Sequence, residues 1–286
     1  MKLKQRLAIG YIQTKFKVLT AFSTKRAAEK AFELFCTPYL KVKRKGDPPQ
    51  AEKLSFSLKL QFSEPRSLTI RGHRWNHPSE QRILLLHGFG SASFKFEQYV
   101  AGLTNKGYEV LAFDAPAHGS SEGKHTNAVE YCEMIKEVMK RYGPIHGFVA
   151  HSFGGIALSL ALEETGKHKD ARVVFIAPAT ETTSAIDGAF RMLKVKDETV
   201  RQEFDRIIME KSGKPAEWFS VRRAVKNIQS SILWVHDEED DITPFSDALK
   251  VIEDNHPHIQ FIITKGLGHQ KIYRDETVKK QVIDFL

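Results

Sequence analysis

Short, largely apolar segments recur from residue 83 onward, and they constrain the fold more than any other feature of the sequence. A segment of this length without polar alternation is typical of a strand buried on both faces of a sheet. Stretches with helical spacing lie between most of these segments. Strands that alternate with helices in this way predict an α/β fold, a mostly parallel twisted sheet with helices on both faces. The apolar segments are residues 83–86, 110–113, 147–150, 173–176, 232–235 and 259–263, and the helical stretches are residues 94–106, 128–142, 155–165 and 245–254.

The residues that follow these strands are where chemistry is expected, because ligands of such sheets bind at the carboxyl ends of the strands. Ser152 follows the third of the strands, within the segment Ala-His-Ser-Phe-Gly-Gly at residues 150–155. A serine between small residues at a strand-to-helix junction can occupy a sharp, strained turn that exposes its hydroxyl. Ser152 is therefore a candidate nucleophile. The alternative is a helix N-cap serine beside packing glycines, and this segment alone favours neither.

Two further strand ends supply the partners that a serine nucleophile needs. A serine hydroxyl needs a histidine to accept its proton, and the histidine needs a carboxylate to fix its tautomer. An acidic loop, Asp-Glu-Glu-Asp-Asp at residues 237–241, follows one strand, and His269 follows the last one. The order serine, acid, histidine is the one that this architecture uses. A solvated loop and a surface histidine are the alternatives, but three coincidences at strand ends favour a catalytic triad.

A glycine-containing turn after the first apolar strand could complete such a site. The segment Leu-His-Gly-Phe-Gly at residues 86–90 follows that strand. Acyl transfer needs donors for the developing oxyanion, and these are usually backbone N–H groups. We expect the amides of Phe89 and Phe153 to form the oxyanion hole, and we expect His87 to shape the loop rather than act as an acid or base.

Together, these motifs resemble those of the α/β-hydrolase superfamily, in particular esterase- and lipase-like serine hydrolases. The resemblance covers about residues 68–286 and implies an α/β-hydrolase fold. It identifies Asp240, four residues before Pro244, as the triad acid, with Asp237 and Asp241 as fallback choices. It also implies a small helical cap over the active site, inserted after the sixth strand at about residues 180–222. The resemblance rests on residues 86–90, 114–121, 150–155, 240–244 and 268–269; Ala150 and Ala117 stand where the family usually has glycine.

The resemblance implies a serine hydrolase that cleaves a carboxylic ester or thioester through an acyl-enzyme intermediate. It implies no cofactor and no metal, and a small-molecule, ester-like substrate. Other triad chemistry on the same fold (amide, C–C bond or peracid) is one alternative. A catalytically silent binding or scaffold protein is another, and the intact triad argues against it. The apolar content of the cap suggests an uncharged, partly hydrophobic substrate, although the same side chains could simply pack the cap onto the core.

Positive charge is concentrated at the N-terminus. Residues 1–53 hold 13 Lys and Arg against 4 Asp and Glu, whereas residues 54–286 hold 30 against 31. A nearly neutral body argues against nucleic-acid binding, which needs a basic face on the folded domain. We therefore predict a basic N-terminal helical arm and linker at residues 1–60, with a helix at residues 24–35, and a hydrolase domain at residues 61–286.

The arm has two interpretations. Its mixture of basic and apolar residues is typical of a helix that rests on an anionic membrane surface. The alternative, which we favour, is that its apolar face folds back over the body or pairs with another subunit. No apolar stretch is long enough to span a bilayer, and Lys15 and Lys17 interrupt the one segment that imitates a signal peptide. We expect a cytoplasmic protein, with peripheral membrane contact through the arm as the open alternative.

Overall fold

The computed structural model describes residues 3–39, 42–61, 65–166 and 168–286. Its centre is an eight-stranded sheet in the order β1-β2-β4-β3-β5-β6-β7-β8. Strands β3 to β8 pair in parallel, and β1 and β2 add an antiparallel edge beside β4. The strands are Glu52–Leu60 (β1), Arg66–Trp75 (β2), Arg82–Leu86 (β3), Glu109–Phe113 (β4), Gly147–His151 (β5), Arg172–Ile176 (β6), Ser231–Asp237 (β7) and Ile259–Thr264 (β8).

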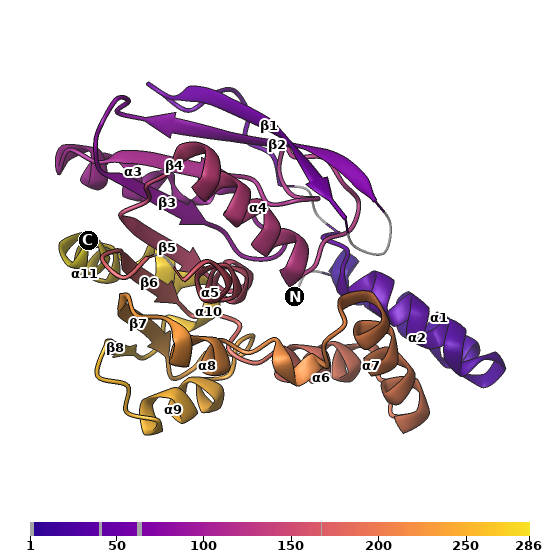
Figure 1. Cartoon of the computed structure of the whole chain (residues 1–286). Coiled ribbons are helices and arrows are strands. Elements are labelled where there is room, and N and C mark those ends of the chain that lie inside the picture. Colours follow the sequence, from indigo (N-terminus) through magenta and orange to yellow (C-terminus); the bar gives the residue numbers. More distant parts are fainter. Residues whose placement is uncertain (1–2, 40–41, 62–64, 167) are drawn as a thin grey trace.

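Helices cover both faces of this sheet (Figure 1), which confirms the predicted α/β fold. The buried side chains form two clusters, one on each face. Strand β3 is apolar from Ile83 to Leu86 because both of its faces are buried: Leu84 and Leu86 belong to one cluster, and Ile83 and Leu85 belong to the other. The helices are Leu3–Phe22 (α1), Thr24–Phe35 (α2), Glu97–Asn105 (α3), Ala128–Tyr142 (α4), Phe153–Thr165 (α5), Thr182–Leu193 (α6), Glu198–Ser212 (α7), Val221–Ala224 (α8), Phe245–Glu253 (α9), Gly268–Lys271 (α10) and Glu276–Phe285 (α11).

The sheet begins earlier in the chain than the sequence pattern predicts. Residues 52–60 had been expected to belong to the arm and linker, but they form β1, which pairs along its whole length with β2. Phe56, Leu58 and Leu60 are buried on one side, and Ser57 and Lys59 between them are exposed. Alternation of buried and exposed residues with a period of two is typical of an antiparallel strand that has one face buried. The boundary between arm and body therefore lies before residue 52.

Between β6 and β7 the chain leaves the sheet and forms α6, α7 and α8. This insertion comprises residues 180–222. Its two ends, which form its neck, are joined by backbone hydrogen bonds from Val221 N–H to the Thr180 carbonyl at 2.8 Å and from Thr182 N–H to the Phe219 carbonyl at 3.2 Å. Ile186 and Phe190 of α6 and Phe204 of α7 are buried. Helices α6 and α7 lie beside α1 and α2, to one side of the sheet (Figure 1).

The inner face of the arm (α1 and α2) packs on the insertion. Ala27, Ala28 and Ala31 of α2 are fully or almost fully buried, and α2 runs along α7. The rings of Phe32 and Phe204 have centroids 5.7 Å apart. The predicted helix at residues 24–35 is confirmed, and its partner is the insertion rather than the sheet.

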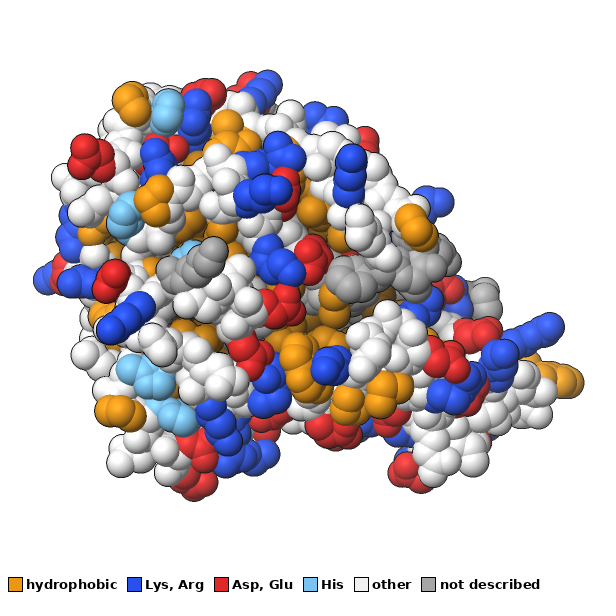
Figure 2. All heavy atoms as spheres, in the orientation of Figure 1, with side chains coloured by type: hydrophobic (Ala, Val, Ile, Leu, Met, Phe, Trp, Pro, Cys, Tyr) orange, Lys and Arg blue, Asp and Glu red, His pale blue; other side chains and the backbone are white. Residues whose placement is uncertain are grey.

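The outer face of the arm stays open to solvent. Figure 2 shows hydrophobic side chains at the far end of the arm, next to Lys and Arg side chains. In the described part of the chain, no helix is long and apolar enough to cross a membrane.

Candidate active site

Ser152 lies at a strained turn between β5 and α5. Its backbone has φ of 53° and ψ of −117°, a region that non-glycine residues rarely adopt. The Ser152 N–H donates to the Ile176 carbonyl at 3.2 Å, and the Ser152 carbonyl accepts from Gly155 at 2.9 Å and from Ala179 at 3.0 Å. Ser152 occupies the N-cap position of α5, but its side chain makes no capping hydrogen bond. The hydroxyl is therefore available for another partner.

That partner is His269, which lies in α10, the short helix that follows β8. The Ser152 Oγ lies 3.0 Å from His269 Nε2, and His269 Nδ1 lies 2.8 Å from Asp240 Oδ2. All three side chains are buried. The structure thus brings Ser152, His269 and Asp240 into one hydrogen-bonded chain, although the outer two are separated from His269 by 117 and 29 residues.

The loop after β7 orients one carboxylate toward His269. Asp240 Oδ1 accepts hydrogen bonds from the amides of Ile242 at 2.9 Å and Thr243 at 2.8 Å. Burial raises the pKa of the Asp240 carboxyl, but the hydrogen bond and charge of His269 and the two amides outweigh it, so the pKa lies below its usual value. Asp240 is therefore held ionised, as a partner for an imidazole N–H.

The two fallback carboxylates have other positions. Asp237 is buried and accepts hydrogen bonds from the Glu239 amide at 3.0 Å, the Thr264 hydroxyl at 2.7 Å and the Leu267 amide at 3.1 Å. It thereby ties the acidic loop to the turn that carries His269. Asp241 is exposed.

Thr243 and His151 contact the same chain of residues, and the sequence analysis assigned neither of them. The Thr243 hydroxyl lies 2.8 Å from Asp240 Oδ2 and 3.1 Å from His269 Nδ1. His151 donates from Nε2 to the His269 carbonyl at 3.1 Å, and its ring packs at a tilt of 44° against that of Tyr273, with centroids 4.5 Å apart. Burial, together with the nearby His269, lowers the pKa of His151 to about 3, so the ring is neutral. Both residues help to fix the position of His269.

The turn after β3 is braced by two buried histidines. His87 accepts from the Ala115 amide at 3.0 Å and donates to the Gly88 carbonyl at 2.8 Å, while His118 accepts from the Gly90 amide at 2.9 Å. Burial lowers the pKa of His87, which keeps it a neutral, loop-shaping residue as expected. Ala117, in the loop that carries His118, has φ of 65°, which explains why glycine is common at such a position.

Phe89 and Phe153 come together beside Ser152. Their ring centroids are 5.4 Å apart, nearly perpendicular. Gly88 lies directly against the turn that carries Ser152 (the elbow, residues 150–155), because a Cβ at Gly88 would stand 3.0 Å from the Ser152 Cβ. Among the described residues, no hydrogen bond is donated by the amide of either phenylalanine. The turn after β3 and the first amide of α5 therefore bring two unengaged donors to the same region as the serine.

The close contact between α5 and β3 predicts opposite effects for two glycine-to-alanine substitutions. At Gly154 a Cβ would lie 2.9 Å from the carbonyl oxygens of His87 and Leu86, so Gly154→Ala should destabilise the fold by about 1–3 kcal/mol. At Gly188, inside α6, the nearest atom is a flexible arginine tip at 3.8 Å, so Gly188→Ala should stabilise the fold by about 0.5–1 kcal/mol. Urea denaturation of both variants checks this. Equal stabilities would contradict the predicted contact at the elbow.

Candidate metal ligands elsewhere have other partners. Cys132, Glu133 and Glu164 cluster within 4.8 Å, but the Lys136 ammonium lies 2.6 Å from Glu133 and 2.7 Å from Glu164. The ammonium therefore already balances these carboxylates. That the chemistry needs no cofactor or metal stays a prediction.

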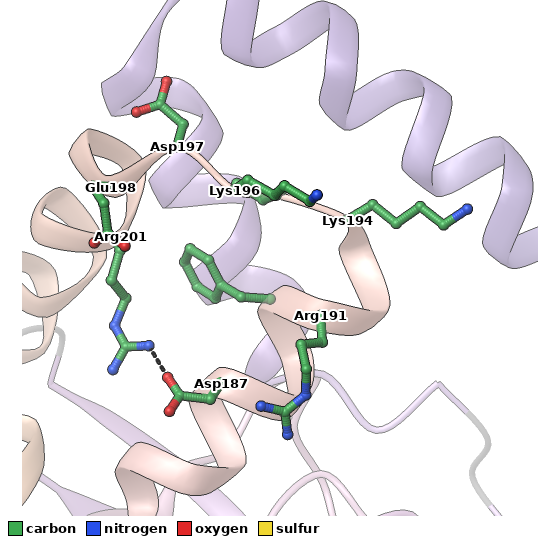
Figure 3. Close-up of a pocket in the computed structure, with 9 residues that line it drawn as sticks. Asp187, Arg191, Lys194, Lys196, Asp197, Glu198 and Arg201 are labelled. Carbon is green, nitrogen blue, oxygen red and sulfur yellow. Dashed lines mark hydrogen bonds and ion pairs between the residues drawn. The ribbon is translucent and has the colours of Figure 1, made fainter.

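A cavity of about 550 Å³ lies in the insertion (Figure 3). Charged side chains of α6, α7 and the turn between them line it, with Phe190 among them. Arg201 reaches across the cavity to pair with Asp187, as the dashed line in Figure 3 marks. None of the residues that line it belongs to the hydrogen-bonded chain of Ser152, His269 and Asp240 or to the turn after β3.

The chain is similar to known proteins over most of its length. A family model described as "Alpha/beta hydrolase family" matches residues 83–276. Uncharacterized hydrolase YugF of Bacillus subtilis is 33% identical over 109 residues, which span only 40% of that protein and 35% of this chain. Esterase YjfP of Escherichia coli is 22% identical over 183 residues, or 59% of this chain and 72% of that protein. The solved structure of the Pyrococcus furiosus esterase Pf2001 shares the fold, with a TM-score of 0.62 at 20% identity over 86% of this chain and 98% of that chain.

Proposed function

This chain belongs to the alpha/beta hydrolase family, and on that premise we propose that it is a serine hydrolase that cleaves a carboxylic ester or thioester through an acyl-enzyme intermediate. The observation that carries the proposal is the hydrogen-bonded chain from Ser152 through His269 to Asp240. A buried serine on a strained turn, within 3.0 Å of an imidazole nitrogen, has the geometry of an activated nucleophile.

In the first step, the Ser152 oxygen attacks the carbonyl carbon of the substrate while His269 Nε2 accepts the hydroxyl proton. The Asp240 carboxylate holds the Nδ1–H tautomer and balances the positive charge that forms on the imidazole. Asp240 suits this role because its pKa lies below the usual value, so it stays ionised at neutral pH.

The tetrahedral intermediate carries an oxyanion, for which we assign the amides of Phe89 and Phe153 as donors. Collapse of the intermediate expels the alcohol or thiol, which takes the proton from His269, and leaves Ser152 acylated. Water then attacks the acyl group with His269 as the base, and release of the carboxylic acid restores the serine. No step needs a group beyond the chain and water.

The insertion is assigned as the cap that borders the substrate pocket. The apolar side chains of the insertion are weaker support for an uncharged, partly hydrophobic substrate than the sequence alone suggests, because several of them pack against one another. The ring centroids of Phe190 and Phe204, for example, lie 5.3 Å apart, and those of Phe204 and Phe35 of the arm lie 5.8 Å apart. These side chains of the insertion therefore pack within the insertion and against the arm. The names of similar proteins, esterase YjfP and esterase Pf2001, support an ester as the substrate.

Hydrolysis of p-nitrophenyl esters of increasing acyl length tests the proposal. We expect turnover, with a rapid initial release of p-nitrophenol when acylation outpaces deacylation. A fluorophosphonate probe should label one residue, Ser152, which peptide mass spectrometry identifies. A folded protein that neither hydrolyses any ester or thioester nor reacts with the probe would instead be a silent binding protein.

A further inference from the structure

The outer face of the arm exposes large apolar side chains that its packing on the insertion does not use. Phe22, at the end of α1, is 84% exposed, and Val18, one turn earlier, is 54% exposed. Phe16 is buried and Leu19 is half-buried on the inner side of the same helix. Residues four apart share a helical face, so Val18 and Phe22 form one exposed apolar stripe. Exposed apolar side chains that adjoin one another, next to charged ones, are a feature of interaction sites.

Basic side chains adjoin this stripe. Lys17 precedes Val18 on α1, and Lys25 and Arg26 stand on the first turn of α2; all three are exposed. None of the three lies within ion-pair distance of an acidic side chain that the structure describes, whereas Lys30 pairs with Glu33 at 2.5 Å. Glu29 is the acidic residue nearest to them along α2, and the charge of Lys25 also helps to lower the pKa of Glu203 on α7. The end of the arm is therefore apolar at its tip, with basic side chains, and some acidic ones, next to it (Figure 2).

The insertion adds further cations to the same layer. The Gln13 amide donates to the Met192 carbonyl at 2.7 Å, which fixes the end of α6 beside the middle of α1. Met192 is itself exposed, and so are Arg191, Lys194 and Lys196 on either side of it. Figure 3 shows Lys194 and Lys196 at the turn between α6 and α7, beside the helices of the arm. Exposed basic side chains thus continue from the arm onto the end of α6, where the exposed Asp197 and Glu198 follow Lys196.

We propose that this arm–insertion surface binds an anionic lipid membrane, with Phe22 and Val18 entering the boundary between headgroups and acyl chains and the basic side chains facing the lipid phosphates. Charge complementarity selects this partner, because the two arm helices (residues 3–35) hold seven basic residues against two acidic ones, while residues 54–286 are nearly neutral. A second copy of the chain would bring the same cations against themselves, which like charges oppose.

Co-sedimentation of the full chain with lipid vesicles tests this proposal. The protein should pellet with vesicles of mixed phosphatidylcholine and phosphatidylglycerol and should stay in the supernatant with pure phosphatidylcholine. Added salt should release it, because screening weakens attraction between exposed charges. The Ser152→Ala variant should pellet like the wild type, so binding is measured independently of any hydrolysis.

Substitutions on the surface should weaken the binding, and matched substitutions on the body should not. Phe22→Ala should lower the apparent affinity about tenfold, because an inserted aromatic side chain is lost. Reversing Lys17 and Arg26 together to glutamate should lower it by about 25-fold or more, since each basic residue near an anionic surface contributes about fivefold. The matched controls are Leu249→Ala on α9 and the pair Lys59→Glu and Lys280→Glu, which remove an exposed apolar side chain and the same net charge from the body.

Circular dichroism and thermal melting establish that each variant is folded. The proposal is overturned if the anionic vesicles leave the protein in the supernatant, if pure phosphatidylcholine binds it equally well, or if the body controls lose as much binding as the arm variants. A dimer in solution that Phe22→Ala converts to a monomer would assign this surface to a second copy of the chain, and would also overturn it.

Discussion

The variant Ser152→Ala should hydrolyse esters about 10⁶ times more slowly than the wild type while folding normally, because loss of a triad nucleophile leaves only the residual catalysis of the oxyanion site and substrate binding. The side chain is small and its hydroxyl bonds only to His269 among the described contacts, so the substitution leaves no large cavity. Steady-state kinetics with a p-nitrophenyl ester measures the effect, and reaction with a fluorophosphonate should vanish together with turnover.

Ser159→Ala is the matched control for this variant. Ser159 is also buried on α5, and its hydroxyl donates within the helix to the Ile156 carbonyl at 2.9 Å. It should retain both turnover and labelling. If Ser152→Ala, shown to be folded, kept the activity of the wild type, the assignment of Ser152 as nucleophile would be wrong.

Asp240→Asn should lower kcat by about 10⁴, because an amide cannot hold the His269 tautomer that accepts the serine proton. The asparagine oxygen can still accept from the amides of Ile242 and Thr243, so the loop should keep its shape. The loss should therefore appear in kcat and not in the melting temperature. Kinetics and thermal melting on the same preparation separate these two quantities.

The neighbouring carboxylates make this a sharp comparison. Asp241→Asn, at an exposed position, should leave both activity and stability unchanged. Asp237→Asn should cost about 1–3 kcal/mol of stability, because a buried carboxylate that accepts three described hydrogen bonds loses its charge. If Asp241→Asn were the substitution that abolished turnover, the register of the acidic loop on Pro244 would be off by one residue.

The sequence could predict those residues of the site that directly follow a predicted strand. Ser152, Asp240 and His269 each follow an apolar strand, and parallel strands place their carboxyl ends at one edge of the sheet. Periodicity alone left five acidic residues as candidates, and the resemblance to a family pattern chose Asp240 among them. In the structure the choice has a local cause, because Thr243 binds Asp240 through both its amide and its hydroxyl.

Other features depend on contacts that no local pattern encodes. His151 was visible in the elbow segment, but its bond to the carbonyl of His269 joins residues 118 positions apart. The partner of α2 was likewise unpredictable, because its apolar face fits any complementary helix and only the fold brings α7 to it. The sequence pattern did not predict strand β1, although the apolar Phe56, Leu58 and Leu60 alternate with polar residues. The reason is that the charged stretch before β1 resembles a linker, which placed the start of the hydrolase domain after β1.

The aromatic contacts between α2 and α7 bear on how the protein can be re-engineered. The rings of Phe32 and Phe35 of the arm both pack against the ring of Phe204 of the insertion. The two segments therefore share one small core, although more than 160 residues of sequence separate these side chains. A chimera that receives only residues 180–222 from a relative would leave these phenylalanines facing a foreign surface. The module to transfer is therefore the insertion together with its own arm, and recombination breakpoints belong before β1 and at the neck of the insertion.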